Sequence, residues 1–295
     1  MRFKHILVVG VGLIGGSFAM AARRFGLADR ITGLDNSTQL EEAVSAGVID
    51  GAEEGFGSSG STCDADLIYL SCPVRSIIAF LRESGRFVRP GTLVTDAGST
   101  KREICLAADE SLPQGVRFVG GHPMAGSHLS GLGSSSPDLF QGAPYAVVPA
   151  QNSSAEDIEQ VAELARALGA SPEILTPSEH DHAVALVSHA PQLLSTALAL
   201  STPTGGDVQR LTRLAGKGFS DCIRLAAGHW PIWEDICRTN SDEIDFALMN
   251  LIRELELLRL NVKTGDFKSL GNSFIAGSEF ARKFLKAKAS SKSGQ

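Results

Sequence analysis

A histidine at a glycine-rich break is the residue in this sequence most able to do chemistry. The run 116–119 has the character of a strand; it ends at Gly120 and Gly121, and His122 and Pro123 follow. Histidine titrates near neutrality, so an uncharged His122 could take the proton of a substrate hydroxyl group while a hydride leaves the carbon that bears this hydroxyl. The residues leave a second interpretation equally open, in which His122 only stabilises a turn.

Hydroxyl groups follow a neighbouring candidate strand. The stretch 91–98 is this strand, and Ser99, Thr100 and Lys101 come at its end. Ligands of an open α/β sheet bind beyond the carboxyl ends of its strands, so a hydroxyl and the imidazole of His122 are expected to converge there. Thr100 is a candidate substrate contact. Ser99 could instead cap the helix that begins near residue 101.

A glycine loop of the kind that binds dinucleotides lies near the start of the sequence. The stretch HILVVGVGLIGGSF, residues 5–18, carries G-x-G-x-x-G directly after a candidate strand and at the start of a candidate helix. Gly10 permits a tight turn, Gly12 lets the backbone approach a pyrophosphate, and Gly15 lets helix and strand pack closely. The free N–H groups of the helix start favour an anion. The loop residues expected to bind the cofactor are Gly10, Gly12, Leu13, Ile14 and Gly15.

An acidic residue after the second candidate strand indicates which dinucleotide binds. Asp35 ends the strand 30–35 and lies 20 residues after Gly15. A carboxylate there binds the ribose hydroxyls and repels a 2′-phosphate, so NAD is expected rather than NADP. Asp35 could instead cap the helix predicted over 37–47, or serve in both roles. One further strand end is expected to pass beside the cofactor, with Cys72, Pro73 and Val74.

The order of the candidate elements indicates the fold. Short strand-like runs alternate with helical stretches in the first half of the sequence, which is typical of βαβ units and a mainly parallel sheet. Strand signals vanish after Pro177. We expect an α/β dinucleotide-binding domain over 1–176 and an all-α domain over 177–295, in which about 286–295 form a frayed tail.

Two features of the helical region indicate that it is shared between subunits. The stretch 183–201 is too apolar for a surface helix and is interrupted by Pro191. The stretch 242–266 carries apolar residues at alternating steps of four and three, which makes one long stripe. Two such segments are hard to cover within about 119 residues, so we expect a homodimer through this domain.

Composition excludes several classes of protein. The chain has 295 residues, of which 43% are hydrophobic and 20% charged, and its net charge of −6 comes without a basic stripe, so no nucleic acid partner is expected. Five cysteines without C-x-x-C spacing indicate reduced thiols in the cytoplasm and no structural zinc. The pair His180 and His182 has no evident third ligand, so no metal is expected.

The first residues have the pattern of a signal peptide, but the regular glycines and Arg23-Arg24 favour a strand, a turn and a helix. No apolar run reaches the roughly 18 residues of a membrane span.

Several motifs occur in the order and approximate spacing of a known family. After the glycine loop come DAGSTK, FVGGHPMAGS, LFQGAPY, EHDHAVALVSHAPQ and GFSDCIRLAAGHWPIWEDI. Together they resemble the prephenate dehydrogenase family, which includes arogenate and cyclohexadienyl dehydrogenases of tyrosine biosynthesis, from about residue 5 to about residue 270. The resemblance implies a Rossmann-type NAD(P) domain followed by an all-helical domain that dimerises.

The reaction of that family is an oxidative decarboxylation. A hydride leaves the ring carbon that bears the 4-hydroxyl, the ring carboxylate departs as CO2, and the ring becomes aromatic. Prephenate would give 4-hydroxyphenylpyruvate, and arogenate would give tyrosine. The resemblance therefore implies an NAD-dependent oxidoreductase with a small-molecule substrate.

The resemblance also implies roles by position. His122 resembles the histidine that accepts the proton of the 4-hydroxyl, and Ser99 resembles the serine that orients the hydroxyl, the histidine and the nicotinamide. Arg224 resembles the arginine that binds a substrate carboxylate through two hydrogen bonds. Trp233 resembles a tryptophan near this pocket, although it could as easily belong to the core. His189 keeps its family position, and a substrate role is as open as that of a buried, hydrogen-bonded histidine.

This sequence departs from the family pattern at several positions. The family block often ends in SHLPH, whereas this chain has Gln192 in place of the last histidine. The neutral amide of Gln192 could meet either the keto group of prephenate or the amino group of arogenate, so the preferred substrate stays open. His128 stands where many relatives carry an acid, and FSDCIR replaces FRDxTR around Arg224. The stretch 126–138 is either a flap over the substrate or a loop.

Two other functions are compatible with a dinucleotide-binding fold. A dehydrogenase of the β-hydroxyacid type would need a catalytic lysine on a helix of the second domain, and Lys217 lies in a glycine-rich loop instead. A dinucleotide-binding regulator without turnover has no need of Ser99, His122 and Arg224 together. The prephenate or arogenate dehydrogenase interpretation is therefore preferred.

Overall fold

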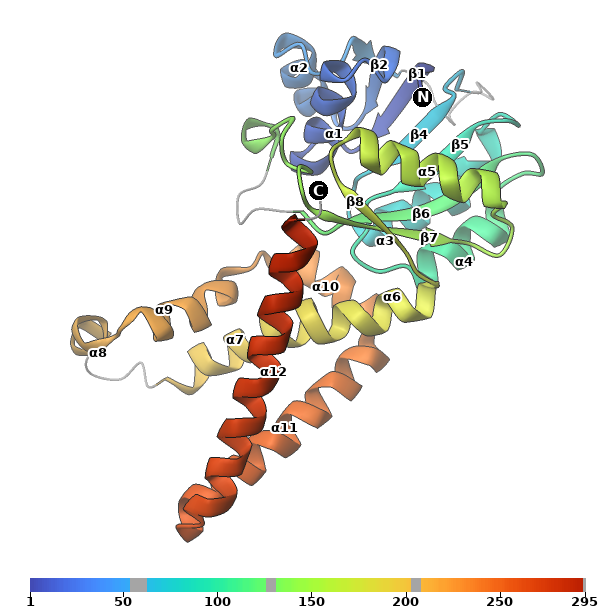
Figure 1. The fold of residues 1–295 in the computed structure, drawn as a ribbon. Helices are drawn as coiled ribbons and strands as arrows, with labels where there is room; N and C mark the ends of the chain where they lie inside the picture. Colours follow the sequence, from blue (N-terminus) through green and yellow to red (C-terminus); the bar gives the residue numbers. More distant parts are fainter. Residues whose placement is uncertain (54–62, 126–130, 203–207, 294–295) are drawn as a thin grey trace. The chain divides into compact units, whose positions relative to one another are not determined.

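The computed structural model describes residues 1–53, 63–125, 131–202 and 208–293 (Figure 1). These residues form two units, Met1–Ser241 and Asp242–Gln295. His128 lies outside the described residues, as do the first residues of the predicted flap over 126–138.

One eight-stranded sheet organises the first unit. Its strands are β1 (Phe3–Val9), β2 (Ala28–Leu34), β3 (Gly51–Ala52), β4 (Leu67–Leu70), β5 (Leu93–Asp96), β6 (Arg117–Pro123), β7 (Pro144–Pro149) and β8 (Ser171–Ile174). They lie in the order β3-β2-β1-β4-β5-β6-β7-β8, and all neighbours are parallel except β6 and β7. The predicted mainly parallel sheet is therefore confirmed. All residues of β4 and β5 are buried, as expected for parallel strands covered on both faces.

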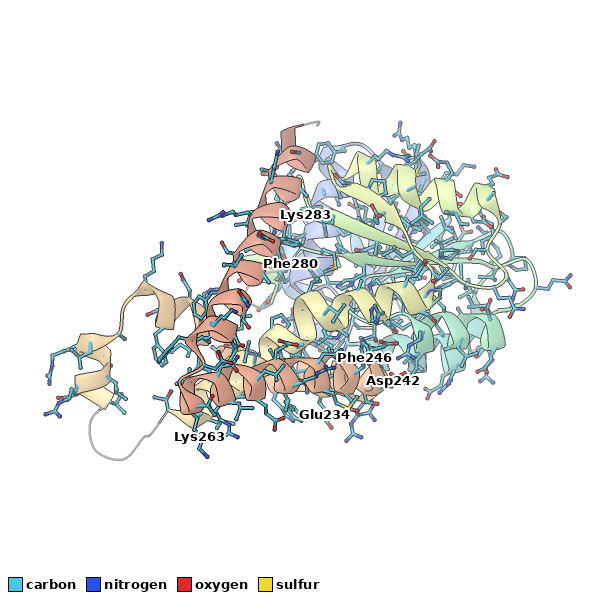
Figure 2. All side chains as sticks on the ribbon, turned by 60° about the horizontal axis from the view of Figure 1, so that its bottom comes forward. Glu234, Asp242, Phe246, Lys263, Phe280 and Lys283 are labelled. Carbon is cyan, nitrogen blue, oxygen red and sulfur yellow. The ribbon has the colours of Figure 1, made fainter. Side chains whose placement is uncertain are left out.

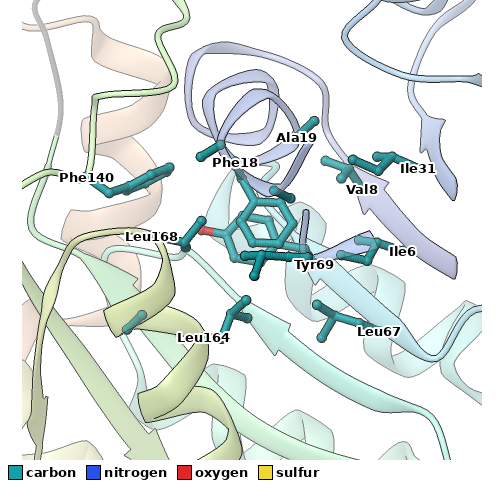
Figure 3. Packing of buried hydrophobic residues seen from close by; sticks show 14 of the residues in the cluster. Ile6, Val8, Phe18, Ala19, Ile31, Leu67, Tyr69, Phe140, Leu164 and Leu168 are labelled. Carbon is teal, nitrogen blue, oxygen red and sulfur yellow. The ribbon is translucent and has the colours of Figure 1, made fainter. Parts of the chain in front are cut away.

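Helices cover both faces of this sheet (Figure 1). On one face lie α1 (Leu13–Arg24), α2 (Ser37–Ser45) and α5 (Ala155–Ala167). On the other lie α3 (Val74–Ala79), the π turn η1 (Phe80–Ser84), the 3₁₀ turn η2 (Gly85–Phe87) and α4 (Arg102–Ser111). Successive residues of β1 alternate between the two hydrophobic clusters, because strand side chains point to opposite faces. Where α1 meets the sheet, Phe18 stacks on Tyr69 with ring centroids 3.8 Å apart (Figure 3).

A row of helices completes the first unit. α6 (Pro177–Val184) continues through the π turn η4 (Ala185–His189) into α7 (Ala190–Ser201). At Pro191 the interruption takes the form of this π turn: Pro191 lies in the first turn of α7, and the π turn before it accommodates the missing N–H. The remaining elements are α8 (Val208–Leu214), α9 (Lys217–Ile223), the 3₁₀ turn η5 (Arg224–Ala227) and α10 (Trp230–Thr239).

Two aspartates of these helices cap helices that follow strands of the sheet. α4 has no capping side chain of its own, and Asp181 in α6 accepts hydrogen bonds from the Lys101 and Arg102 N–H groups at 2.7 and 3.0 Å. Asp235 in α10 accepts from the Arg75 N–H at the start of α3, at 3.0 Å. A carboxylate at a helix N-terminus satisfies free N–H groups and is favoured by the helix dipole. These caps fix α6 and α10 near the carboxyl ends of β4 and β5.

The second unit consists of two helices, α11 (Ser241–Thr264) and α12 (Phe267–Ser293). α12 is helical as far as Ser293, so the tail expected to fray from about residue 286 consists of helical residues up to that point, and its fraying stays a prediction. Lysine and alanine are good helix formers and extend the preceding turns. Large apolar side chains are exposed along both helices; Phe246 is 46% exposed and Phe280 is 69% exposed (Figure 2). Helices that are apolar on several sides are normally covered by another surface.

One helical segment has the length and apolar composition of a membrane span. Among the described residues this is Pro177–Ser201, with 33% of its most apolar window buried. By this measure the expectation that no segment is long and apolar enough is wrong. The same helix carries His180, Asp181 and Gln192, which are buried and bond to neighbouring parts of the first unit. Such polar side chains are expensive in lipid and suit a helix packed inside a protein.

Candidate active site

The glycine loop joins β1 to α1. Gly10 has a φ of +90°, which side-chain-bearing residues rarely adopt, and a Cβ there would lie 2.8 Å from the Cys72 nitrogen. A Cβ on Gly15 would lie 2.0 Å from the Gly10 carbonyl oxygen, so helix and strand approach this closely only with glycine. A Cβ on Gly12 would meet nothing within 4 Å, and Gly12 precedes a helix start without a side-chain cap. This open space beside free N–H groups can accept an anion.

A cavity of about 440 Å³ adjoins the loop. The predicted cofactor residues that line it are Gly10, Gly12, Asp35, Cys72 and Pro73. The others do not line it: Ile14 and Val74 pack in the two hydrophobic clusters, and Leu13 and Gly15 belong to the first turn of α1.

Backbone groups hold the carboxylate of Asp35. Its Oδ2 accepts a hydrogen bond from the Val11 N–H at 2.8 Å, and its Oδ1 accepts from the Asn36 N–H at 2.7 Å. The cap of α2 is Asn36, whose side chain accepts from Gln39, so the alternative that Asp35 caps this helix is wrong. Asp35 thus ties the end of β2 to the glycine loop and brings a negative charge to the cavity wall. This charge favours a ribose with free hydroxyls over a 2′-phosphate.

A buried ion pair holds the backbone just before His122. Asp96 and Lys101 form this pair, and both side chains are 0% exposed. Lys101 Nζ donates to the Gly121 carbonyl oxygen at 2.8 Å, and the Gly121 N–H donates to Asp96 Oδ1 at 3.0 Å. A Cβ on Gly121 would lie 2.4 Å from the Asp96 carbonyl oxygen, so glycine is required for this approach. The glycine break therefore fixes the end of β6 and with it the position of His122.

The half-buried His122 meets a second, fully buried histidine. His122 Nδ1 lies 2.9 Å from His180 Nε2, and His180 Nδ1 lies 2.8 Å from Asp181 Oδ1. Burial of the ring, with further effects of His180, Lys101 and His189, holds the pKa of His122 well below its ordinary value. His122 is therefore uncharged at neutral pH, which is the state that a proton acceptor needs.

The two hydroxyl residues after β5 differ in their surroundings. Ser99 is half-buried, and its hydroxyl forms no hydrogen bond within the described part of the chain. It does not cap α4, because Asp181 does so. Thr100 is buried, and its hydroxyl lies 2.7 Å from that of Thr239 in α10. The structure therefore does not support the expected contact between Thr100 and substrate.

The four predicted substrate residues of the helical region lie in different surroundings. His189 and Trp233 meet edge to face with ring centroids 5.9 Å apart, and burial lowers the pKa of His189 to about 4. Gln192 is buried and donates from Nε2 to the Leu225 carbonyl oxygen at 2.7 Å. Arg224 is exposed at the start of η5 and forms no ion pair among the described residues.

Two residues that the sequence did not single out connect these histidines. Asp181 binds His180, and Asn240 donates from Nδ2 to the Asp181 carbonyl oxygen at 2.8 Å. The same Nδ2 lies 3.3 Å from His189 Nδ1, so one amide joins both histidine environments. The His180-Asp181 pair, just before the apolar stretch that begins at Ala183, was the signal available in the sequence for Asp181. Asn240 carries no such signal.

Two features considered in the sequence stand apart from this cluster. Lys217 is not in a loop, as predicted, but is the exposed first residue of α9. His182 is exposed, whereas His180 is buried against His122. Across the part of the chain that the structure describes, no three metal-binding side chains come together.

Two family models match this chain in succession. The model "Prephenate dehydrogenase, nucleotide-binding domain" matches residues 18–174, and "Prephenate dehydrogenase, dimerization domain" matches residues 176–275. The prephenate dehydrogenase of Bacillus subtilis (strain 168) is 34% identical over 278 residues, which make up 93% of this chain and 74% of that protein.

Solved structures are similar over nearly the whole chain. The prephenate dehydrogenase of A. aeolicus, solved in complex with hydroxyphenyl propionate and NAD+, has a TM-score of 0.85 at 27% identity and covers 97% of this chain and 99% of that one. The Synechocystis arogenate dehydrogenase has a TM-score of 0.80 at 28% identity and covers 95% of this chain and 100% of that one. By sequence and by fold, the chain belongs to the prephenate dehydrogenase family.

Proposed function

We propose that this chain is an NAD-dependent dehydrogenase that oxidatively decarboxylates prephenate, arogenate or both. The observation that carries the proposal is the position of His122 at the end of β6, with Nδ1 2.9 Å from His180 Nε2, in the same sheet whose first strand leads into the dinucleotide loop. Burial of the ring lowers the pKa of His122, which favours the uncharged form that a proton acceptor needs. Relatives named prephenate dehydrogenase and arogenate dehydrogenase support this reaction type.

The glycine loop and Asp35 fit NAD. The open space at Gly12 and the uncapped start of α1 would hold the pyrophosphate, and Asp35 would hold the ribose hydroxyls. When bound there, NAD supplies the acceptor for the hydride. A solved relative that contains NAD+ supports this cofactor.

His122 would take the proton of the 4-hydroxyl. As a hydride leaves the ring carbon that bears this hydroxyl, the O–H proton passes to His122 and the carbon–oxygen bond gains double-bond character. The bond between the ring and its carboxylate then breaks, CO2 leaves, and the electron pair makes the ring aromatic, after which the phenol oxygen regains a proton. Ser99 would orient the hydroxyl, and the guanidinium of Arg224 would bind a substrate carboxylate.

The remaining parts of the proposal concern the helical region. His189, Trp233 and Gln192 would lie near the substrate's side chain, with Gln192 held by its bond to Leu225. We place the boundary between the domains at 176/177, close to the change from the first family model, which ends at residue 174, to the second, which begins at residue 176. A homodimer is supported by the match to a dimerization domain and by the exposed apolar side chains of α11 and α12. The free cysteines support a cytoplasmic location.

A direct assay tests the function. The purified protein is supplied with prephenate or arogenate and with NAD, and the absorbance of reduced nicotinamide is followed while the aromatic product is identified. We expect turnover with at least one substrate, and the ratio of the two kcat/KM values gives the preference. Absence of turnover with both substrates would remove the proposed function.

Replacing Asp35 by serine tests the choice of dinucleotide. The Asp35→Ser variant loses the charge that repels a 2′-phosphate, so we expect the ratio of kcat/KM for NAD to that for NADP to fall by about tenfold or more. NAD affinity should also fall, because the bond from the Val11 N–H to Asp35 is lost. Asn36→Ser, which keeps a cap at α2, is the matched control. An unchanged ratio in Asp35→Ser would contradict the ribose assignment.

A further inference from the structure

We infer that His180 and Asp181 hold His122 in the one neutral tautomer that can accept a proton from substrate, with the hydrogen on Nδ1 and the lone pair on Nε2. His180 and Asp181 are positioning residues, since they act through His122. The inference rests on the proposed function, in which His122 is the proton acceptor. It follows from a chain of hydrogen bonds that runs from α6 to β6.

The direction of each hydrogen bond in this series follows from the Asp181 carboxylate at its end. A carboxylate only accepts hydrogen bonds, so His180 Nδ1, at 2.8 Å from Asp181 Oδ1, must donate. The neutral His180 ring then carries its lone pair on Nε2. His122 Nδ1 lies 2.9 Å from that nitrogen and must donate to it. The other nitrogen of a neutral His122, Nε2, is left as an acceptor.

Asp181 is fixed well enough to set this direction. Its side chain is 0% exposed, and it accepts from the Lys101 N–H at 2.7 Å, the Arg102 N–H at 3.0 Å and Arg102 Nε at 3.2 Å. Burial raises the pKa of Asp181, but the hydrogen bonds from His180 and from the start of α4 outweigh this and lower it. Asp181 is therefore a carboxylate at neutral pH.

The other charged groups nearby leave both rings neutral. At His180, burial and Lys101 lower the pKa, while Asp181 and Asp96 act in the opposite direction and are outweighed. At His122, burial, His180, Lys101 and His189 all lower the pKa. Two neutral rings in series with a carboxylate allow only one placement of the hydrogens. The carboxylate also stabilises the cation that His122 becomes when it takes the proton.

Replacing Asp181 by asparagine should reverse the direction of the hydrogen bonds between residue 181, His180 and His122. Arg102 directs two N–H groups at Oδ2, whereas the Lys101 N–H is directed at Oδ1, the oxygen that faces His180. The amide oxygen of asparagine is therefore expected on the Arg102 side, where it keeps two of these three hydrogen bonds, and its NH2 group then faces His180 Nδ1. His180 must then donate from Nε2, and His122 must carry its hydrogen on Nε2. A wrong tautomer of this kind lowers kcat by up to about 10⁴-fold, so we expect a loss of about 10²–10⁴-fold with KM and the NAD Kd within about twofold.

The tautomer is measured without reference to activity. Two-bond 1H–15N spectra of protein labelled at the histidine ring nitrogens distinguish a protonated nitrogen from a bare one, and His122→Asn identifies the signals of His122. We expect Nε2 of His122 to be bare in the wild type and protonated in Asp181→Asn. A bare Nε2 in both proteins, or a kcat of Asp181→Asn within about threefold of wild type, would overturn the inference.

Two variants at His180 test whether this residue sets the tautomer of His122, even if Asp181→Asn does not fold. In His180→Gln the amide oxygen can still accept from His122 Nδ1, whereas in His180→Leu nothing accepts there. We expect kcat of the glutamine variant to exceed that of the leucine variant by about tenfold or more, with the wild-type tautomer kept only in the former. Equal kcat values and equal spectra would contradict the inference. His182→Gln, on the exposed side of α6, is the control and should leave kcat unchanged.

Failure of this inference is distinguishable from failure of the proposed function. If the wild-type protein oxidises neither prephenate nor arogenate, the function fails, and the spectra still report which nitrogen of His122 is bare. If the protein turns over and the spectra show a protonated Nε2 in the wild type, the function stands and the positioning role is wrong.

Discussion

Replacing His122 by asparagine is expected to lower kcat by about 10²–10⁴-fold and to leave the Kd of NAD within about twofold. Asparagine keeps a polar side chain at the end of β6 but cannot take a proton. The cavity beside the glycine loop is not lined by His122, so dinucleotide binding has no reason to change. Steady-state kinetics give kcat, and titration of the protein's fluorescence with NAD gives Kd. A comparable loss of NAD binding would mean that His122 is structural.

The pH profile checks the same residue without a mutation. Because the pKa of His122 is depressed, the ring stays neutral as pH falls through the region near 6.5 where an ordinary histidine becomes protonated. We therefore expect kcat/KM to stay level through that region and to fall only at lower pH, where the ring takes a proton and can no longer accept one. A fall of kcat/KM centred on the ordinary histidine pKa would show that the His122 ring is not desolvated as the structure implies.

The features that the sequence predicts well are those set by residues close together in the chain. The strands β1 and β2, the glycine loop and α1 follow from apolar runs and glycine spacing, and the structure has them within a few residues of the expected bounds. The two-residue strand β3 was not predicted, since Gly51 and Ala52 have neither length nor pattern. The alternative role of Asp35 as the cap of α2 lies one residue too early, because both Asp35 and Asn36 are good caps and only the backbone geometry decides between them.

The features that the sequence misses depend on contacts between distant segments. Asp181 caps α4 from about eighty positions further along the chain, and no local pattern around either segment indicates that they meet. The hydroxyl of Thr100 likewise lies 2.7 Å from that of Thr239, a partner that no local pattern indicates. His122 was predicted by position, but burial and the neighbouring His180 lower its pKa, and only the packed structure reveals both.

The buried pair of Lys101 and Asp96 gives the largest stability effect that we expect in this chain. Lys101→Met removes the cation and leaves the Asp96 carboxylate in a fully buried site, where it still accepts from the N–H groups of Gly98 and Gly121. Removing one partner of a buried ion pair destabilises a protein by about 3–5 kcal/mol, because the remaining charge is uncompensated. Urea unfolding at pH 7 and a fixed protein concentration, followed by circular dichroism, measures this free energy.

An exposed pair provides the matched control for Lys101→Met. Arg166 and Glu159 lie 2.8 Å apart with side chains 52% and 56% exposed, and such surface pairs contribute about 0–1 kcal/mol. We therefore expect Arg166→Met to change the free energy of unfolding by less than about 1 kcal/mol, several times less than Lys101→Met. Because Lys101 Nζ also holds the Gly121 carbonyl, Lys101→Met should lower kcat even under conditions where the variant is fully folded. Wild-type stability in Lys101→Met would mean that Asp96 is neutralised in another way, and that the glycine break before His122 does not depend on the ion pair.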